Sequence, residues 1–333
     1  MKVSVIVVTL NEEQNIQACL DSLLKQDVPK EDYEVLVVDG ASRDKTQEIV
    51  QKSAKEHHIV RLIVEKDGSI ARCRNIGIQQ SKYDSVAFTD ADCVVPVDWL
   101  RRLKRGYARH TVGIKNLAGV GGANIPSENG SSFQHAIGIA FNSFFGSLGS
   151  IQAQPVKYNK VLFSISCSNS LYQKKALIDV GMFSEELGNQ GEDWDLGAKL
   201  QKKGYVVYGI HDCAVWHNFR ATPFLFWKNM VFYGDGRMRL TKKHPDFVKG
   251  KYIVPLFFIP LFILSGGAFY ITRNPYVSLP FLYFPVMLVY SLYSAARAKK
   301  IELGLEVFLV FLLQHFGYSF GEWKGLRWFL LLE

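Results

Sequence analysis

Residues 3–24, VSVIVVTLNEEQNIQACLDSLL, carry the pattern that indicates the architecture of this 333-residue chain. Residues 3–8 are almost all apolar and mostly β-branched, which is typical of a strand covered on both faces in a parallel sheet. We expect Asn11 to cap the helix that follows, in which Ile16 and Leu20 share one apolar face. A buried strand followed by an amphipathic helix is the repeating unit of an α/β fold.

The same unit recurs along the first hundred residues. Apolar runs at 34–39, 60–65 and 85–90 alternate with helical patterns at 44–57 and 69–80. This order predicts an α/β fold with an open, doubly wound, Rossmann-like sheet of mostly parallel strands, in which ligands bind beyond the carboxyl ends of the strands. The elements expected after residue 110 are strands at 117–123, 161–166 and 205–209 and a helix near 192–203.

Residues 129–156 contain no Asp, Glu, Lys or Arg, yet they include four phenylalanines. This composition fits a buried helix with a loop, and it also fits a flap that faces a membrane or an acceptor molecule.

Positive charge is concentrated in the last third of the chain. Residues 1–220 hold 26 Lys and Arg against 25 Asp and Glu, whereas residues 221–333 hold 13 against 6. The same region carries long apolar runs, so its basic residues suit an anionic membrane surface better than a nucleic acid. The five cysteines never form a Cys-x-x-Cys pair, which indicates reduced thiols in a cytosolic compartment.

Two uncharged runs in this region are long enough to cross a bilayer. Residues 252–272 and 275–296 number 21 and 22, and about 20 apolar residues span the hydrocarbon core. Basic residues precede the first run and follow the second, so the positive-inside rule predicts a multi-pass protein of the cell membrane whose preceding domain is cytoplasmic. A third run, about 303–321, contains Gln314 and His315 and fits either a third span or an interfacial helix. The predicted domains are 1–220, a basic and aromatic membrane-interface segment at 221–251, and a transmembrane region at 252–333.

Two aspartates follow the fourth predicted strand. In VAFTDADC, residues 86–93, Asp90 and Asp92 are one residue apart, so each raises the pKa of the other unless a positive group is near. A divalent cation such as Mg²⁺ or Mn²⁺ is the simplest such group, since one or two carboxylates commonly hold these ions. Asp39 ends the second strand, and TLNE at 9–12 follows the first. We therefore expect polar side chains from three neighbouring strand ends to face one crevice.

Five motifs, in this order, resemble the family 2 glycosyltransferases, whose nucleotide-sugar fold is called GT-A. The resemblance covers about residues 3–220, and the motifs are VSVIVVTLNEEQNI, VLVVDGASRDKT, ARCRNIGI, FTDADC and GNQGEDWDLGAKLQKKGY. The membrane tail resembles that of the exopolysaccharide and lipid-linked-oligosaccharide transferases in this family.

The resemblance implies a role for individual residues. Asp39 would hydrogen-bond the nucleotide base, Asp92 would bind the metal ion, and Asp193 would be the catalytic base with Glu192 beside it. The implied residues for the nucleotide-sugar donor are Thr9, Asn11, Glu12, Asp39, Arg74 and Asp90, and the implied metal ligands are Asp92, Asp90 and His217.

Some of these positions have other interpretations. Asp193 also fits a cap for the helix that begins there, His217 also fits a packing residue, and His211 is a competing metal ligand. Gln173 stands where the family pattern has a basic residue. We expect Cys93, like Cys167, to be a small strand-end residue without chemistry.

The resemblance implies an inverting transferase that moves a sugar from a nucleotide-diphosphate sugar to a hydroxyl, with Mn²⁺ or Mg²⁺ as cofactor. A hydroxyl must lose its proton to a carboxylate, whereas a lipid phosphate is already ionised. The Glu192–Asp193 pair therefore favours a hydroxyl of a membrane-associated acceptor, such as a lipid-linked saccharide. The alternative within the family is a polyprenyl-phosphate glycosyltransferase.

Three other classes fit the sequence less well. An aspartate-nucleophile phosphatase would carry its Asp-x-Asp motif on the first strand, and a sugar nucleotidyltransferase would carry an early glycine-rich phosphate loop. A membrane receptor with a degenerate nucleotide fold would have no need of the complete set of acids.

Overall fold

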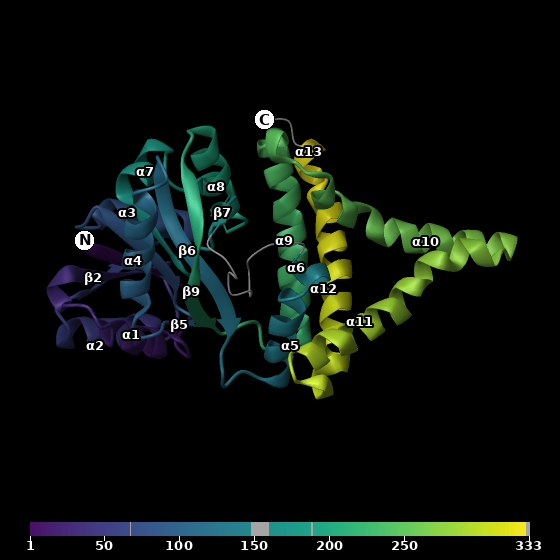
Figure 1. Ribbon diagram of the computed structural model, residues 1–333, viewed down its shortest axis with the longest axis horizontal. Helices are drawn as coiled ribbons and strands as arrows, with labels where there is room; N and C mark the ends of the chain where they lie inside the picture. The colour runs from purple at the N-terminus through teal and green to yellow at the C-terminus, as the bar shows by residue number, and fades with distance from the viewer. Residues whose placement is uncertain (67, 148–159, 188, 331–333) are drawn as a thin grey trace. The chain divides into compact units, whose positions relative to one another are not determined.

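The computed structural model describes residues 1–66, 68–147, 160–187 and 189–330. The described residues form two compact units, one within 1–125 and 151–218 and the other within 126–150 and 219–333. The first unit contains a mixed sheet with helices on both faces, and the second is helical (Figure 1).

The sheet of the first unit has two halves. Its order is β3-β2-β1-β4-β8-β6-β9-β5, with β7 paired to β9, counting only the described residues. The first half is parallel and consists of β1 (Val3–Thr9), β2 (Tyr33–Asp39), β3 (Val60–Val64) and β4 (Ser85–Asp90). The second half consists of β5 (Cys93–Val94), β6 (Leu117–Pro126), β7 (Lys160–Leu162), β8 (Ser170–Gln173) and β9 (Val206–His217). In it, β8 pairs antiparallel with β4 and β6, and β9 pairs antiparallel with β5 and β7.

The four parallel strands confirm the predicted α/β units, and their burial explains the continuous apolar runs. On one face, Val5 and Val7 of β1 pack with α1 (Ile16–Leu24), α2 (Thr46–Glu56) and α4 (Trp99–Thr111). On the other face, Ile6 packs with α3 (Ile70–Gln80), α7 (Lys174–Asp179) and α8 (Glu192–Lys202). Successive side chains of a strand point to opposite faces, so a strand covered on both sides needs apolar residues throughout.

The strand order creates a switch point at β1. The chain builds β2 and β3 on one side of β1 and then returns to place β4 on its other side. In open α/β sheets, ligands bind at the carboxyl ends of the strands at such a point.

The predicted cap of the first helix is wrong. The N-cap of α1 is Asn15, and Asn11 has a φ of 55°, which is a left-handed conformation that an N-cap does not adopt. The backbone N–H of Asn11 donates to Oγ of Ser42 at 2.7 Å, and its Oδ1 accepts from the N–H of Arg43 at 2.8 Å. Asn11 therefore ties the loop after β1 to the loop after β2.

Several elements differ from the predictions beyond residue 110. β7 is shorter than the strand expected at 161–166, and β9 extends the one expected at 205–209 as far as His217. The sequence did not predict β5 or β8, because strands of two and four residues leave no periodic pattern.

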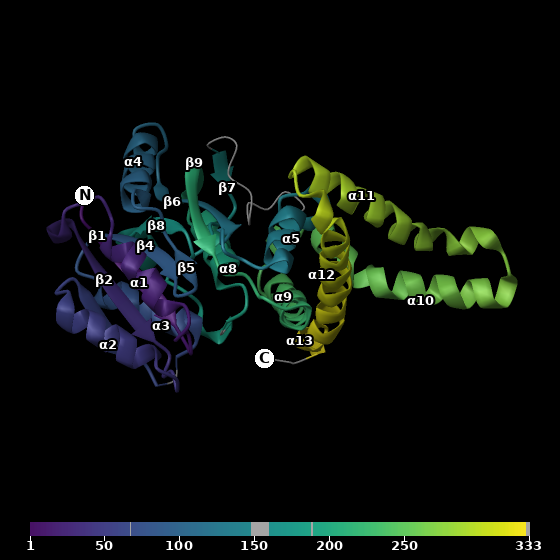
Figure 2. The ribbon, with the colours of Figure 1, turned by 90° about the horizontal axis from the view of Figure 1, so that it is seen from below.

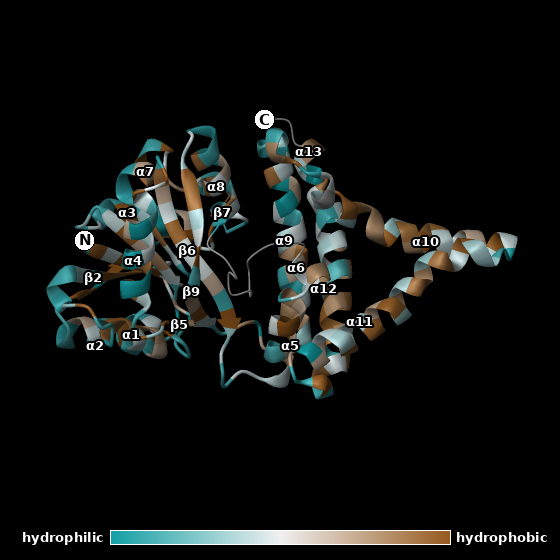
Figure 3. Ribbon diagram, viewed as in Figure 1, coloured by the Kyte–Doolittle hydropathy of each residue, from teal (hydrophilic) through white to brown (hydrophobic). Residues whose placement is uncertain are grey.

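The described part of the second unit consists mainly of five helices. They are α5 (Ser132–Phe141), α9 (Pro223–Lys243), α10 (Val254–Thr272), α11 (Tyr283–Arg297, preceded by the 3₁₀ segment Pro275–Leu282) and α12 (Gly304–Gly325). α10 and α11 form a hairpin that carries mostly hydrophobic residues (Figures 2 and 3). Three segments, 254–272, 275–297 and 301–330, are long and apolar enough to cross a membrane.

The charge-free segment contributes a buried helix to this second unit. Phe133, Ala136 and Ile137 of α5 lie in one apolar cluster with residues of α9, α11 and α12. The sequence alone did not indicate this association. The part of the segment from 148 to 156 lies outside the described residues.

α9 and α12 are in close backbone contact. A Cβ added to Gly321 of α12 would lie 2.1 Å from the carbonyl oxygen of Val231, and one added to Gly234 of α9 would lie 2.2 Å from that of Tyr318. Only glycine permits this approach, as in the small-residue interfaces of membrane helices.

Candidate functional site

Three strand ends meet at one edge of the sheet in the first unit. Thr9 lies opposite Asp39 in the β1–β2 pair, and Val8 lies opposite Asp90 in the β1–β4 pair. Neighbouring strands are about 4.8 Å apart, so the backbones at Asp39 and Asp90 are about 10 Å apart. The structure thus brings together residues that the sequence predicted at one crevice.

The Asp39 carboxylate is buried and oriented by the loop that follows β2. Its Oδ1 accepts hydrogen bonds from the N–H of Ser42 at 2.8 Å and from Nε2 of Gln47 at 2.7 Å, and its Oδ2 accepts from Oγ of Ser42 at 2.5 Å. Beside it, the hydroxyl of Thr9 is buried and has no hydrogen-bond partner in the described part of the chain. A buried hydroxyl in this state is suited to a ligand that supplies the missing hydrogen bond.

Glu12 lies in the loop that connects β1 to α1. Its N–H donates to Oγ1 of Thr46 at 2.8 Å, and its Oε2 accepts from Nδ2 of Asn15 at 2.6 Å. Together with the contacts of Asn11, these hydrogen bonds hold the loop after β1 against the loop after β2, and the two loops form one wall of the site beside Asp39.

Arg74 of α3 is buried between two carboxylates. Its Nη2 lies 3.0 Å from Oδ1 of Asp90 at the end of β4, and its Nη1 donates to Oε1 of Glu192 at the start of α8. A guanidinium presents several donors in a fixed plane, so it can hold two carboxylates at once. Arg74 of α3 is therefore joined to the end of β4, the next element along the chain, and to α8, where Glu192 lies 118 residues away.

Asp90 and Asp92 have different positive or potentially positive partners, which explains how they can lie so close together. Asp90 pairs with Arg74, and Asp92 lies beside His217. Burial raises the pKa of Asp90, the Arg74 guanidinium acts in the opposite direction, and the Asp92 charge adds to the rise, so that the pKa is raised overall. A cation at this edge would favour the ionised form of both carboxylates.

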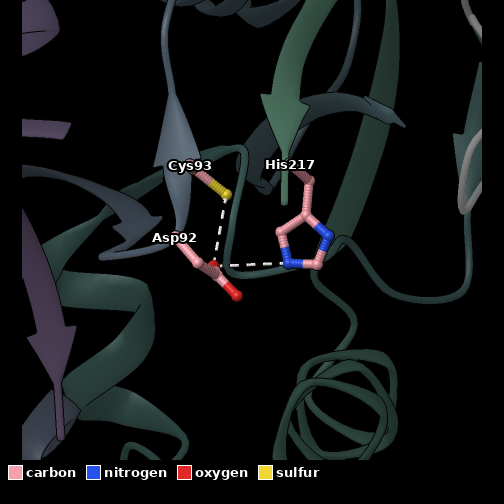
Figure 4. Close-up of side chains that lie close together, drawn as sticks. All are labelled: Asp92, Cys93 and His217. Carbon is pink, nitrogen blue, oxygen red and sulfur yellow. Dashed lines mark hydrogen bonds and ion pairs between the residues drawn. The ribbon is translucent and has the colours of Figure 1, made fainter. Parts of the chain in front are cut away.

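Asp92, Cys93 and His217 form a group of three potential metal ligands within the described residues (Figure 4). Oδ1 of Asp92 lies 3.3 Å from Nε2 of His217 and 3.8 Å from Sγ of Cys93, and the three donor atoms lie within 4.8 Å of one another. The group arises because β5 pairs antiparallel with β9, with Cys93 opposite His217.

His211, the competing ligand in the sequence, lies elsewhere on β9. It is six positions before His217, which corresponds to about 20 Å along an extended strand. Its Nδ1 lies 2.6 Å from Oδ2 of Asp212, and both side chains are largely exposed. The structure therefore brings His217, and not His211, to Asp92.

The Asp92–His217 pair fits a divalent cation. Adjacent ligands of an octahedral ion with bonds of about 2.1 Å are about 3 Å apart, close to the 3.3 Å between Oδ1 and Nε2. Carboxylate oxygen suits both Mg²⁺ and Mn²⁺, whereas imidazole nitrogen favours transition metals. The donor set thus fits Mn²⁺ better than Mg²⁺.

Asp193 lies in the first turn of α8. Gly191 is the N-cap, with a φ of 70°, and Glu192 is the first helical residue, so Asp193 is not the N-cap. Its Oδ1 accepts a hydrogen bond of 2.7 Å from the N–H of Trp194, and the helix dipole favours a negative charge at this end. Asp193 directly follows Glu192, which Arg74 links to Asp90.

Gln173 lies away from this edge of the sheet. β8 is antiparallel to β4, so Gln173 is opposite Ser85, at the end of β4 that is remote from Asp90. Its Nε2 donates to the hydroxyl of Tyr107. The departure from the family pattern at this position therefore leaves the strand-end site unchanged.

The sequence did not indicate three of the residues in this arrangement. Ser42 and Gln47 orient Asp39 through hydrogen bonds. The signal in the sequence that could have indicated them is their position, three and eight residues after a carboxylate at a strand end. Cys93 was expected to have no chemistry, yet its thiol lies among the donor atoms at Asp92.

Comparisons with known proteins identify the family. The family description "Glycosyl transferase family 2" matches residues 4–181, which is more than half of the chain. The enzyme named dolichyl N-acetyl-alpha-D-glucosaminyl phosphate 3-beta-D-2,3-diacetamido-2,3-dideoxy-beta-D-glucuronosyltransferase, from Methanococcus voltae, is 24% identical over 327 residues and 97% of each chain. Glycosyltransferase AglE of Haloferax volcanii is 30% identical over 246 residues, which are 72% of this chain and 73% of that protein.

A solved structure shows the same fold. Mannosyltransferase PcManGT from Pyrobaculum calidifontis, in complex with GDP-Man and Mn²⁺, aligns with a TM-score of 0.60 and 21% identity over 98% of this chain and 87% of its own. At this identity the likeness shows a shared fold, and together with the family match it confirms the predicted GT-A architecture. The chain, with its acidic strand ends gathered at the switch point of that fold, belongs to glycosyl transferase family 2 and is a glycosyltransferase.

Proposed function

We propose that this enzyme transfers a sugar from a nucleotide-diphosphate sugar to a hydroxyl of a lipid-linked saccharide, with inversion at the anomeric carbon and with a divalent metal ion. The observation that carries the proposal is the convergence of acids at one sheet edge. Asp39 and Asp90 flank the end of β1, Asp92 lies beside His217, and Arg74 ties the first turn of α8 to Asp90.

The donor would bind along the ends of β1, β2 and β4. Asp39, oriented by its loop, accepts hydrogen bonds from the base, and Thr9 offers a buried hydroxyl next to it. Asn11 and Glu12 form the wall toward the ribose, and Arg74 and Asp90 face the ribose and the diphosphate. The GDP-Man in the PcManGT structure supports a nucleotide-sugar donor for this fold.

Asp92 and His217 would hold Mn²⁺ or Mg²⁺, with Asp90 next to them. When bound, the ion acts as a Lewis acid that stabilises the negative charge of the departing nucleoside diphosphate. The Mn²⁺ bound in PcManGT supports this assignment, as does the separation of 3.3 Å between the Asp92 and His217 donor atoms.

Asp193 would act as the general base. The acceptor oxygen bonds to the anomeric carbon while the bond from that carbon to the phosphate oxygen breaks, and its electron pair leaves with the nucleoside diphosphate. The hydroxyl proton passes to the Asp193 carboxylate. A single displacement inverts the anomeric centre. Glu192 holds the Arg74 guanidinium, and we assign it the positioning of the first turn of α8.

The acceptor would be a saccharide on a lipid carrier. The Methanococcus voltae relative, similar over 97% of both chains, is named for transfer to a dolichyl-linked N-acetylglucosaminyl phosphate. The long apolar helices of this chain would keep such an acceptor and the enzyme at the same membrane. A sugar hydroxyl needs the base that Asp193 provides, whereas a polyprenyl phosphate does not.

We propose a multi-pass arrangement with residues 1–220 as a cytoplasmic catalytic domain, although α5 within this range packs with the helices of the second unit, and with 221–251 at the membrane surface. The α10–α11 hairpin then crosses the bilayer twice, because basic residues precede α10 and follow α11. α12 packs along α9, whose last turns carry Arg239, Lys242 and Lys243. This packing favours an interfacial position for α12 over a third span.

A panel of nucleotide sugars tests the reaction. Purified full-length enzyme should release nucleotide from one donor when Mn²⁺ or Mg²⁺ and a lipid-linked saccharide are present. Asp92→Asn should abolish nucleotide release, and His217→Ala should weaken the dependence of nucleotide release on the metal ion. Each change removes one proposed ligand of that ion. Asp84→Asn, which precedes the opposite end of β4, is the control and should behave as wild type.

Two outcomes would contradict the proposal. Full activity in the presence of a chelator, or in Asp92→Asn, would remove the metal from the mechanism. Transfer to a bare polyprenyl phosphate but not to a lipid-linked saccharide would replace the acceptor and leave Asp193 without a proton to accept.

A further inference from the structure

Cys93 adds a third kind of donor to the Asp92–His217 pair. Its Sγ lies 3.8 Å from Oδ1 of Asp92, and Figure 4 shows dashed lines from the Asp92 carboxylate to both the thiol and the imidazole. Cys93 is fully buried, and its position is fixed by the pairing with His217 across β5 and β9. Neither donor binding nor proton transfer, as proposed above, uses this thiol.

The spacing of the three donor atoms suits a tetrahedral ion. Around Zn²⁺, with bonds of about 2.0–2.3 Å, tetrahedral ligand atoms are about 3.4–3.6 Å apart. The O–N separation here is 3.3 Å, the S–O separation is 3.8 Å, and the S–N separation is at most 4.8 Å. A shift of about 1 Å in the Cys93 or His217 side chain would bring all three onto one ion.

We propose that a soft divalent cation such as Zn²⁺ binds to Asp92, Cys93 and His217 together and thereby inhibits the transferase. The inference rests on the proposed metal-dependent function, because it assigns a second ion to the same position. When the metal–sulfur bond forms, the thiol proton is released to solvent. Sulfur and imidazole both favour Zn²⁺ over Mn²⁺, and Zn²⁺ also lies above Mn²⁺ in general affinity for such sites.

Inhibition follows from the number of coordination positions that remain. An octahedral ion held by Asp92 and His217 keeps four positions for phosphate oxygens and water, as Mn²⁺ and Mg²⁺ sites commonly do. A tetrahedral ion held by three side chains keeps one. When Cys93 also binds the metal, the diphosphate of the nucleotide sugar can therefore no longer bind it through two oxygens at once.

Cobalt spectroscopy on the full-length enzyme in detergent tests this inference without an activity assay. Co²⁺ should produce a thiolate-to-metal charge-transfer band in the near ultraviolet in the wild-type protein. The band should disappear in Cys93→Ser. The band should persist in the control variant, Cys19→Ser. The buried Cys19 thiol contacts the backbone carbonyl of Asp90 at 3.6 Å and is not one of the three potential metal ligands.

Calorimetric titration supplies the affinities. The loss of even an outer-shell partner weakens metal binding about 10- to 100-fold, so Cys93→Ser should weaken Zn²⁺ binding at least as much. Its affinity for Mn²⁺ should change by no more than about 3-fold, because Mn²⁺ would not use the thiol. Zn²⁺ should also inhibit Mn²⁺-supported nucleotide release by wild type at lower concentrations than it inhibits Cys93→Ser.

The outcomes separate this inference from the proposed function. Co²⁺ binding to wild type without the charge-transfer band would overturn the role of Cys93 even if the serine variant failed to fold. Equal Zn²⁺ affinities in wild type and Cys93→Ser would do the same, and Mn²⁺-dependent transfer would stand in both cases. If wild type bound neither Co²⁺ nor Mn²⁺, both the metal dependence of the reaction and this inference would be wrong.

Discussion

Replacing Arg74 with methionine should destabilise the first unit and stop sugar transfer. The guanidinium contacts Asp90 at 3.0 Å and Glu192 on its other side, and through these two ion pairs it joins the end of β4 to α3 and α8. Methionine has a similar length and no charge, so the change removes both ion pairs while it keeps most of the packing volume.

The expected loss follows from the burial of the three side chains. Arg74 is 5% exposed and Glu192 12%, so their pair is buried, whereas Asp90 is 32% exposed and partly screened by water. Removal of one partner of a buried pair costs about 3–5 kcal/mol, and the more exposed contact adds less than about 1 kcal/mol. For a unit of this size, a loss of about 3 kcal/mol lowers the melting temperature by roughly 6–12 °C.

Thermal melting of the full-length protein in detergent measures this loss. The matched control is Arg72→Met on the same helix, because Arg72 is 45% exposed and its pairs with Glu65 and Glu185 lie at the surface. The control should cost less than about 1 kcal/mol. Adding Glu192→Gln to Arg74→Met should recover part of the stability, since it removes one of the carboxylates left without a partner. If both arginine variants melted at the same temperature, the proposed role of Arg74 would be wrong.

The other predictions concern the base, the thiols, the topology and the helix packing. Asp193→Asn should slow transfer by about 10²–10⁴ and leave the affinity for the donor within a few-fold, and an equal loss of both would make Asp193 a binding residue. Burial, with smaller contributions from Glu65 and Asp39, raises the pKa of Cys73 to about 11, so about one molecule in a thousand carries the reactive thiolate at pH 8. A thiol reagent should therefore not label it in the native enzyme until the pH approaches 11, and rapid labelling at pH 8 would contradict its burial. A cysteine introduced at Asn274 should react with an impermeant thiol reagent in intact cells while one in the catalytic domain stays protected, and the opposite pattern would invert the topology. Gly321→Ala should lower stability by about 1–3 kcal/mol, because its Cβ would lie 2.1 Å from a backbone oxygen of α9, whereas Gly267→Ala, with nothing within 4 Å, should not.

The first four strands and their helices could be predicted from the sequence because their signals are local. Burial on both faces requires an uninterrupted apolar run, and the end of each run marks where the strand leaves the sheet. The order of these runs was therefore enough to place Asp39 and Asp90 at one edge, since parallel strands end on the same side. The same reasoning failed for Asn11, because a cap and a left-handed turn residue look alike in sequence.

The composition of the candidate metal site depended on pairing between distant residues. The sequence offered both His217 and His211, and nothing local distinguishes two histidines on one strand. The register of the two-residue strand β5 on β9 brings His217 to Asp92 and places the Cys93 thiol in the same group. A pairing this short has no periodic pattern, so it became visible only in the folded chain.

The sequence by itself thus determined where the chain forms its parallel strands, which carboxylates end them, and where apolar runs are long enough for a bilayer, because each of these is a property of consecutive residues. The tertiary structure alone decided which partner each charge has. Arg74 lies 16 residues from Asp90 and 118 from Glu192 along the chain, and only the packing of α3 and α8 at the end of β4 brings all three together. The association of α5 with the C-terminal helices was decided in the same way, by apolar surfaces that only the folded chain brings into contact.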